Sequence, residues 1–225
     1  DYPSPVVAAI RNYVEAGNAA LFLLDPPGVV QGLSTAANDE LAKLLAGWGV
    51  ELQKNWLIAP RDLASLRFGP LTIAVTGYDS HPITSTLGSN LTLFPEARSL
   101  RIVDSKSATV TPLFSSPADA MATDSLGAEG KEIDLSKLPK GPFVMAVAGT
   151  LNTSSPPQAA DAAKPADAKA PPAGRFVVVG NSRWAQNGSL GQYENRNLLA
   201  NSINWLAAEE DLISIPPKSP SEATL

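Results

Sequence analysis

The chain has 225 residues and a net charge of −5, and 44% of its residues are apolar while 17% are charged, a globular rather than a disordered composition. Its lysines and arginines do not cluster, so a nucleic-acid partner is not expected. The absence of cysteine excludes thiol nucleophiles, thiolate metal sites and disulfides, and the single histidine, His81, excludes multi-histidine metal sites.

The first fifty residues predict a helix, a buried strand and a second helix. Ser4 and Pro5 are typical of a helix start, and apolar residues then recur at helical spacing up to Gly17. Residues 19–24 form a continuous apolar run, as expected of a strand that is buried on both faces of a parallel sheet. Asn38 is predicted to cap the second helix.

The rest of the chain predicts several further strands and a final helix. Strong strand patterns lie at 71–75, 108–114, 143–148 and 175–180, and weaker ones at 50–58, 91–94 and 99–103. The final helix is predicted from about Glu194. Helices that alternate with apolar strands predict an α/β fold of three layers, in which helices flank a mostly parallel sheet.

An alanine- and proline-rich segment interrupts this pattern. Residues 155–174 contain five prolines and eight alanines, a composition that buries too little apolar surface to fold on its own. We therefore predict a single domain over 1–215 with a disordered or mobile insertion at 152–174, followed by a polar tail at 216–225. No apolar run approaches the length of a membrane span and no signal peptide is visible, so we expect an excised soluble domain whose anchor lies outside this chain.

Several short motifs, in their order along the chain, resemble a known family. They are YVEAGNAALFLLDP at 13–26, HPIT at 81–84, LFP at 93–95, ARSL at 97–100, GNS at 180–182, NRN at 195–197, NWL at 204–206 and EEDLISI at 209–215. Together they resemble the auxiliary family of uncharacterised ABC-type transport systems, which includes a gliding-motility-associated component. The family often has Asp at the position of Asn181, so a role that needs a carboxylate there is not carried over.

The resemblance implies a fold, a location and partners. The implied fold is similar to class I glutamine amidotransferases (flavodoxin-like) and to the N-terminal domain of an intraflagellar transport protein. A transmembrane helix is implied soon after residues 215–218, which would place the domain on the extracytoplasmic (periplasmic) face of the inner membrane. The implied partners are the permease and ATPase subunits of the transporter. The sequence itself contains no cofactor-binding motif, so no cofactor is expected.

Candidate site residues follow the predicted strands. Ligands of parallel sheets bind beyond the carboxyl ends of the strands, here the loops at 25–28, 77–81, 149–150 and 180–182. We predict that a ligand, such as a sugar, or a partner contacts six residues in these loops: Asp25, Tyr78, Asp79, His81, Asn181 and Ser182.

Catalytic and metal chemistry have little support in the sequence. The segment 180–184 has a glycine and a serine but lacks the second glycine of the Gly-x-Ser-x-Gly nucleophile elbow. A triad of Ser182, His81 and Asp25 is conceivable, but His81 and Asp25 also fit ordinary loop roles. There is no calcium-binding loop and no phosphate-binding lysine motif, so we expect no metal or nucleotide and assign the ATPase to another polypeptide.

Three functions therefore stay open. The leading prediction is a non-catalytic, extracytoplasmic auxiliary domain of an ABC transport system that binds a ligand or a partner. The alternatives are a hydrolase that uses Ser182 and His81, and a purely structural domain for subunit assembly. The asparagines at 195, 197, 201 and 204 suggest sugar binding, but solvent-facing or capping roles for Asn201 and Asn204 are the preferred interpretation.

Overall fold

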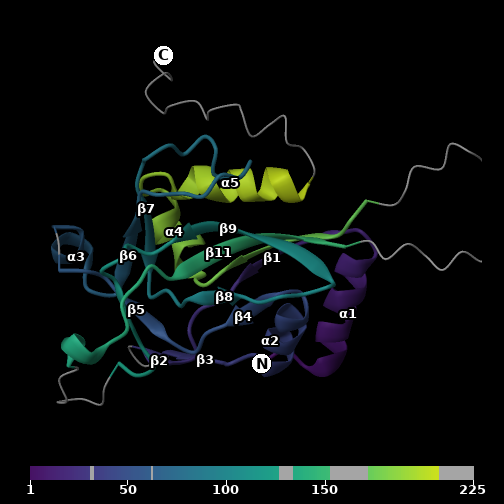
Figure 1. The fold of residues 1–225 in the computed structure, drawn as a ribbon, viewed down its shortest axis with the longest axis horizontal. Coiled ribbons are helices and arrows are strands. Elements are labelled where there is room, and N and C mark those ends of the chain that lie inside the picture. Colours follow the sequence, from purple (N-terminus) through teal and green to yellow (C-terminus); the bar gives the residue numbers. More distant parts are fainter. Residues whose placement is uncertain (31–32, 62, 127–133, 153–171, 208–225) are drawn as a thin grey trace, which may run out of the picture.

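The computed structural model describes residues 1–30, 33–61, 63–126, 134–152 and 172–207 (Figure 1). Its central element is a four-stranded sheet with the order β1-β12-β11-β9. Only β1 and β12 pair in parallel, and β11 pairs antiparallel with both β12 and β9. The bounds of these strands are Ala19–Leu23 for β1, Arg175–Val179 for β12, Val144–Leu151 for β11 and Ala108–Ser115 for β9.

Small antiparallel sheets make up much of the remainder. Each has two strands: β2 (Gly28–Val30) with β3 (Leu33–Thr35), β4 (Val50–Leu52) with β8 (Leu100–Ile102), β5 (Trp56–Ile58) with β10 (Met121–Thr123), and β6 (Thr72–Val75) with β7 (Thr92–Pro95).

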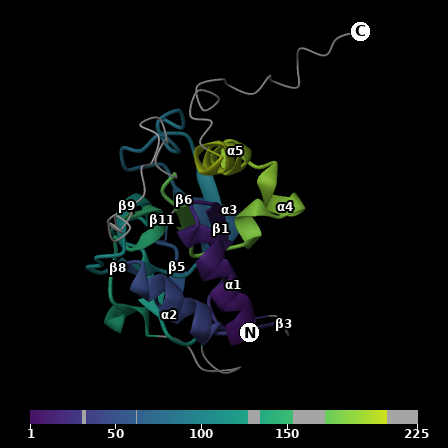
Figure 2. The ribbon, with the colours of Figure 1, turned by 90° about the vertical axis from the view of Figure 1, so that its right-hand side faces the viewer.

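Helices cover the central sheet from opposite sides. Figures 1 and 2 place α5 (Asn195–Leu206) on one side of it and α2 (Asp39–Gly47) on the other. The long helix α1 (Ser4–Glu15) packs beside α2 and β1. The short elements are α3 (Leu63–Phe68), α4 (Asn187–Leu190) and the 3₁₀ turns η1 (Leu135–Lys137) and η2 (Arg183–Ala185).

The prediction of a three-layer, mostly parallel, flavodoxin-like sheet is wrong. The observed fold is a β-rich mixed fold in which most strand pairs are antiparallel. The prediction failed because a continuous apolar run reports burial on both faces and not strand direction. Both β11 and β12 are buried almost throughout, yet they run antiparallel.

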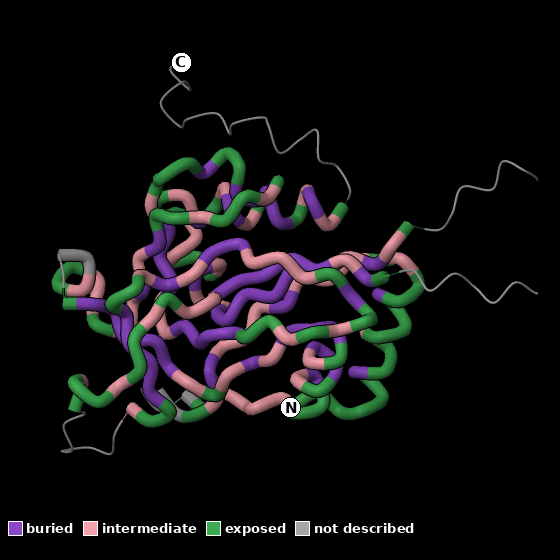
Figure 3. The backbone as a smooth tube through the Cα atoms, in the orientation of Figure 1, coloured by how far each residue is buried: buried purple, intermediate pink, exposed green. Residues whose placement is uncertain are grey.

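Two apolar cores on the two faces of the sheet explain these continuous apolar runs. Alternate residues of β12 point to opposite sides, so that Val177 joins the core under α5 while Phe176 and Val178 join the core under α1 and α2. The buried segments of Figure 3 follow the central strands accordingly. The Phe176 ring stacks on the Trp48 ring at 5.2 Å between centroids.

Most of the predicted elements are present, with small differences at their ends. Asn38 precedes α2 as predicted, but its side chain does not cap that helix and instead accepts a hydrogen bond from the Tyr2 N–H at 3.1 Å. Most of the insertion at 152–174, and all of the tail at 216–225, lie outside the described residues. Within the described ranges, every helix is too short or too polar to span a membrane.

Candidate functional site

The ends of β1 and β12 bring three of the predicted site residues together. Because the two strands are parallel neighbours, the residues that follow them meet at one edge of the sheet. The Ser182 N–H and hydroxyl both donate to the Asp25 carboxylate, at 2.6 Å and 2.5 Å. The Asn181 side-chain amide donates to the same carboxylate at 3.3 Å.

Asn181 is fully buried, and its side chain holds neighbouring backbone in place. Its Nδ2 donates to the Pro95 carbonyl at 2.6 Å, and its Oδ1 accepts from the Trp184 N–H at 2.9 Å. The amide thereby links the end of β12 to the end of β7 and to the turn η2. Both of its polar atoms are used inside the protein, which leaves this side chain little capacity to bind a ligand.

Arg98 completes this group, and the sequence analysis missed it. The residue is only 2% exposed, and its guanidinium donates to the Gln53 carbonyl at 2.6 Å and to the Asp25 carbonyl at 3.2 Å. Burial lowers the pKa of Arg98 to about 10, while the nearby Asp25 carboxylate opposes this shift, so the group is a cation at neutral pH. The only sequence signal for it is its place in the family-like motif at 97–100.

We name Asp25, Arg98, Asn181 and Ser182 the strand-end junction. Glu96 and Arg183 form a partly buried ion pair of 2.9 Å, and each is the close sequence neighbour of a junction residue. The junction is an internally hydrogen-bonded polar network whose donors and acceptors face one another. Such a network fixes backbone segments, and it presents Ser182 to a carboxylate rather than to the imidazole of a serine hydrolase.

The third member of the hypothetical triad lies elsewhere. The His81 ring packs on Trp205 at 5.1 Å between ring centroids, and its Nδ1 accepts from the Ile83 N–H at 3.2 Å. The Trp205 carbonyl accepts from the guanidinium of Arg175, the first residue of β12, whereas Ser182 lies three residues beyond Val179, the last residue of that strand. The five residues of β12 span about 13 Å. The structure therefore does not bring His81 and Ser182 together.

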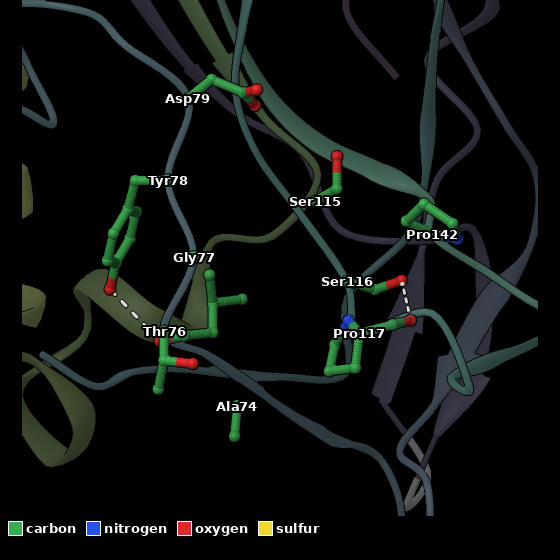
Figure 4. Close-up of a pocket in the computed structure, with 10 residues that line it drawn as sticks. Ala74, Thr76, Gly77, Tyr78, Asp79, Ser115, Ser116, Pro117 and Pro142 are labelled. Carbon is green, nitrogen blue, oxygen red and sulfur yellow. Dashed lines mark hydrogen bonds between the residues drawn. The ribbon is translucent and has the colours of Figure 1, made fainter. Parts of the chain in front are cut away.

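Tyr78 and Asp79 line a separate, open hollow of about 440 Å³ (Figure 4). Asp79 is exposed, while the Tyr78 hydroxyl lies 2.8 Å from the Asn90 carbonyl oxygen and 2.9 Å from the Thr92 hydroxyl. The ten lining residues include one carboxylate and no basic side chain, so the hollow suits hydroxyl or ammonium donors better than anions. The lining residues are Ala74, Val75, Thr76, Gly77, Tyr78, Asp79, Ser115, Ser116, Pro117 and Pro142.

The predicted site residues thus separate into three places: the strand-end junction, the hollow and the ring contact of His81. The predicted loop at 149–150 belongs to none of them, because both residues lie inside the antiparallel strand β11. In the part of the chain that the structure describes, no three His, Asp or Glu side chains are grouped as a metal site would require.

The asparagines of α5 have structural roles. Asn195 is fully buried and clasps the backbone of β7, since its Oδ1 accepts from the Leu93 N–H at 3.0 Å and its Nδ2 donates to the Leu93 carbonyl at 3.1 Å. Asn201 is 7% exposed and donates to the Ile83 carbonyl at 2.9 Å. Asn201 therefore does not face solvent, and its amide caps the neighbouring turn at 82–89, which is the other role expected for it.

Comparisons with known proteins give a family and a fold. The model of a family described as "ABC-type uncharacterized transport system" matches residues 1–209. The solved structure of the mmIFT52 N-terminal domain is similar, with a TM-score of 0.60 and 13% identity over 91% of this chain and 72% of that chain. At this identity the likeness concerns the fold alone, and it agrees with the expected similarity to an intraflagellar transport protein. No curated protein matches the chain.

Proposed function

The chain belongs to the family of ABC-type uncharacterized transport systems, and from this premise we propose that it is a non-catalytic domain that binds a ligand or a partner on the extracytoplasmic face of the inner membrane. Membership makes it an auxiliary component of an uncharacterised ABC transport system.

The hydrogen bond of the Ser182 hydroxyl is the main support for the proposal that the domain is not catalytic. Its hydroxyl donates to Asp25 at 2.5 Å, and His81 packs on Trp205 toward the opposite end of β12. A serine nucleophile needs a base that removes its proton and is free to pass it on. A hydroxyl held in a part-buried structural network serves the fold instead.

The proposed binding region is the hollow beside Tyr78 and Asp79, and the proposed partners are the permease and ATPase subunits of the transporter. The hollow is the place where predicted site residues border open space. Its carboxylate and the hydroxyls of Thr76 and Ser115 are suited to a small polyhydroxylated ligand such as a sugar. We further propose one domain over 1–215, carried by a membrane anchor outside this chain.

The test uses the parent protein in its own membrane. Spheroplasts treated with an external protease should lose the domain while a cytoplasmic marker survives. Crosslinking before solubilisation should recover the permease and the ATPase with the protein. Asp79→Ala should reduce the amount of permease and ATPase that is crosslinked to the protein if the hollow contributes to binding. Asp119→Ala, which removes another exposed loop carboxylate, is the control.

A domain that the protease reaches only after cell lysis would contradict the location. Catalysis is tested separately with ester, amide and glycoside substrates. The wild-type protein and Ser182→Ala should both be inactive. Turnover by the wild-type protein that Ser182→Ala abolishes would contradict the non-catalytic proposal.

A further inference from the structure

One edge of strand β1 has no strand beside it in the described part of the chain. β1 is the terminal strand of the central sheet, and within the described ranges only β12 pairs with it. The Leu24 N–H donates to Val179 and the Asn18 carbonyl accepts from Arg175, so the even-numbered residues face β12. Because N–H and C=O groups alternate in direction along a strand, Ala19, Leu21 and Leu23 point theirs away from the sheet.

This edge lacks the usual protection against pairing with another strand. Exposed edges are normally guarded by charged side chains, prolines or bulges. The sequence of β1 is AALFL, which contains neither a charge nor a proline, and its register with β12 is regular over all five residues. An edge of this kind is a template for a further strand.

Helix α1 adds exposed apolar side chains beside this edge of β1. Val6, Ala9 and Tyr13 follow one another at intervals of three and four residues, which places them on one stripe of the helix, and Tyr2, just before the helix, lines the same groove. Tyr2, Val6 and Tyr13 are 49%, 43% and 55% exposed, and they are three of the seven large apolar side chains that are exposed in the described part of the chain.

A groove of about 610 Å³ separates this stripe from β1, and Figure 2 shows α1 beside β1. We name the residues that line the groove the edge face: Tyr2, Val6, Ala9, Ile10, Tyr13, Ala20, Leu21, Phe22, Leu23, Leu24 and Leu41.

We propose that the edge face is the interface of a homodimer in which β1 pairs antiparallel with β1 of a second copy. The three outward-pointing residues are symmetric about Leu21. A two-fold axis at Leu21 therefore pairs Leu21 with its own copy and Ala19 with Leu23 of the second copy, and every outward N–H and C=O finds a partner. The same operation brings the exposed stripes of the two α1 helices to the interface, because each stripe lines the groove beside its own β1.

The charge distribution favours a second copy as the occupant. A two-fold axis brings each residue near its own equivalent, so a charged side chain at the axis would repel itself. None of the eleven residues of the edge face is charged. The nearest charges on α1, Arg11 and Glu15, do not line the groove.

The available area predicts a weak dimer. With about 150–250 Å² for a whole tyrosine side chain, the half-exposed Tyr2 and Tyr13 together offer roughly 200 Å² per copy. The other residues of the edge face raise this to the order of 500 Å² per copy, so a dimer would bury on the order of 1,000 Å². This is about the lower limit of a specific interface, and association in the micromolar range is expected.

Analytical ultracentrifugation of the whole chain from about 5 µM to 1 mM tests the proposal, because this range covers association of that strength. The wild-type chain should shift from monomer to dimer. Val6→Glu should weaken dimerisation by about a hundredfold, since it places like charges across the interface. Leu21→Pro should do the same, because it removes an outward N–H and no hydrogen bond to β12.

The matched control is Ile203→Glu. Ile203 is a β-branched residue, 50% exposed, on the equally long helix α5, and this variant should dimerise like the wild-type chain. Thermal unfolding of each monomer shows whether the variant is folded. Amide hydrogen exchange should slow at Leu21 and Leu23 as the wild-type concentration rises.

Three results would overturn the proposal. The first is a wild-type chain that stays monomeric up to 1 mM with fast exchange at Leu21, which leaves the edge to a strand of another protein. The second is a monomer with slow exchange at Leu21, which means that the same molecule covers the edge. The third is a dimer that folded Val6→Glu and Leu21→Pro leave intact, which means that another surface associates.

Discussion

The Ser182 hydroxyl donates a hydrogen bond to the Asp25 carboxylate over 2.5 Å, although 157 positions of sequence separate the two residues. The parallel pairing of β1 with β12 produces this contact, because it places both residues just beyond the same edge of the sheet. Arg98 adds a third segment, since it donates to the Asp25 carbonyl. The strand-end junction therefore links the beginning, the middle and the end of the described chain.

Removal of the Asp25 carboxylate should destabilise the fold. Asp25→Ala leaves the Ser182 N–H and hydroxyl without their acceptor and removes the negative charge nearest to buried Arg98. We expect the free energy of unfolding in urea to fall by about 2 kcal/mol, because an unsatisfied buried donor costs about 1–3 kcal/mol and these two donors are part-buried.

Ser182→Ala is the matched control for this change. It removes one hydroxyl and leaves the Ser182 N–H bonded to Asp25, so a loss of about 1 kcal/mol is expected. Equal effects of the two variants would mean that the carboxylate has no role beyond the single hydroxyl contact.

Asn195 should be the most sensitive asparagine of α5. Asn195→Ala removes the amide that bonds both the N–H and the carbonyl of Leu93, a buried residue of β7. We expect a loss of about 2–4 kcal/mol in urea unfolding, since two buried backbone groups lose their partner.

Asn204→Ala, a less buried position on the same helix, should change stability by less than about 0.5 kcal/mol, because alanine favours a helix. Equal losses at the two positions would show that the hydrogen bonds of Asn195 to Leu93 add nothing to the stability of the fold.

The sequence predicts the individual elements better than their arrangement. The strands at 19–24 and 175–180 have apolar runs that mark them clearly, and both are present. The direction of β11 against β12 depends on connections and partners that hydrophobic periodicity does not encode, and the parallel prediction failed there. The residues of the candidate site divide in the same way, into those with a local sequence signal and those whose role depends on distant segments.

Asp25, Asn181 and Ser182 were predictable because they follow strands, which is a local signal. Arg98 and Asn195 acquire their roles through burial against segments that are far away in the chain. An arginine or an asparagine in a single sequence gives no sign that it will be buried, since both types are mostly exposed.

Gly149 should tolerate no side chain. A Cβ there would lie 2.1 Å from the ring of Phe176 on the neighbouring strand β12, and that ring lies between Gly149 of β11 and the Trp48 ring on which it stacks. Gly149→Ala should cost at least about 1–3 kcal/mol through overpacking. In the double variant Gly149→Ala/Phe176→Leu the loss should be smaller than the sum of the two single losses.

Gly47→Ala is the control for the glycine substitution. A Cβ at this helical position meets nothing within 4 Å, so we expect a gain of about 0.5–1 kcal/mol. A loss at Gly149 that Phe176→Leu does not relieve would mean that the ring is not the obstacle.

Tyr78 should make stability depend on pH above about 10. Burial raises the pKa of the Tyr78 phenol above its ordinary value of about 10, the Thr92 hydroxyl opposes this shift, and Glu194 adds to it. Between the ordinary and the raised pKa, the folded protein holds a proton that the unfolded chain releases. The contribution is therefore present below pH 10 and is lost as the pH rises through the folded pKa.

The measurement is urea unfolding between about pH 8 and pH 11. The free energy of unfolding should decline less steeply for Tyr78→Phe than for the wild-type chain, and the late-ionising part of the phenolate absorbance should disappear. Tyr193→Phe, which changes an exposed tyrosine, should keep the steeper decline. Identical pH profiles for the wild-type chain and Tyr78→Phe would mean that the phenol is no better shielded than in the unfolded chain, and that the wall of the hollow at Tyr78 is open to water.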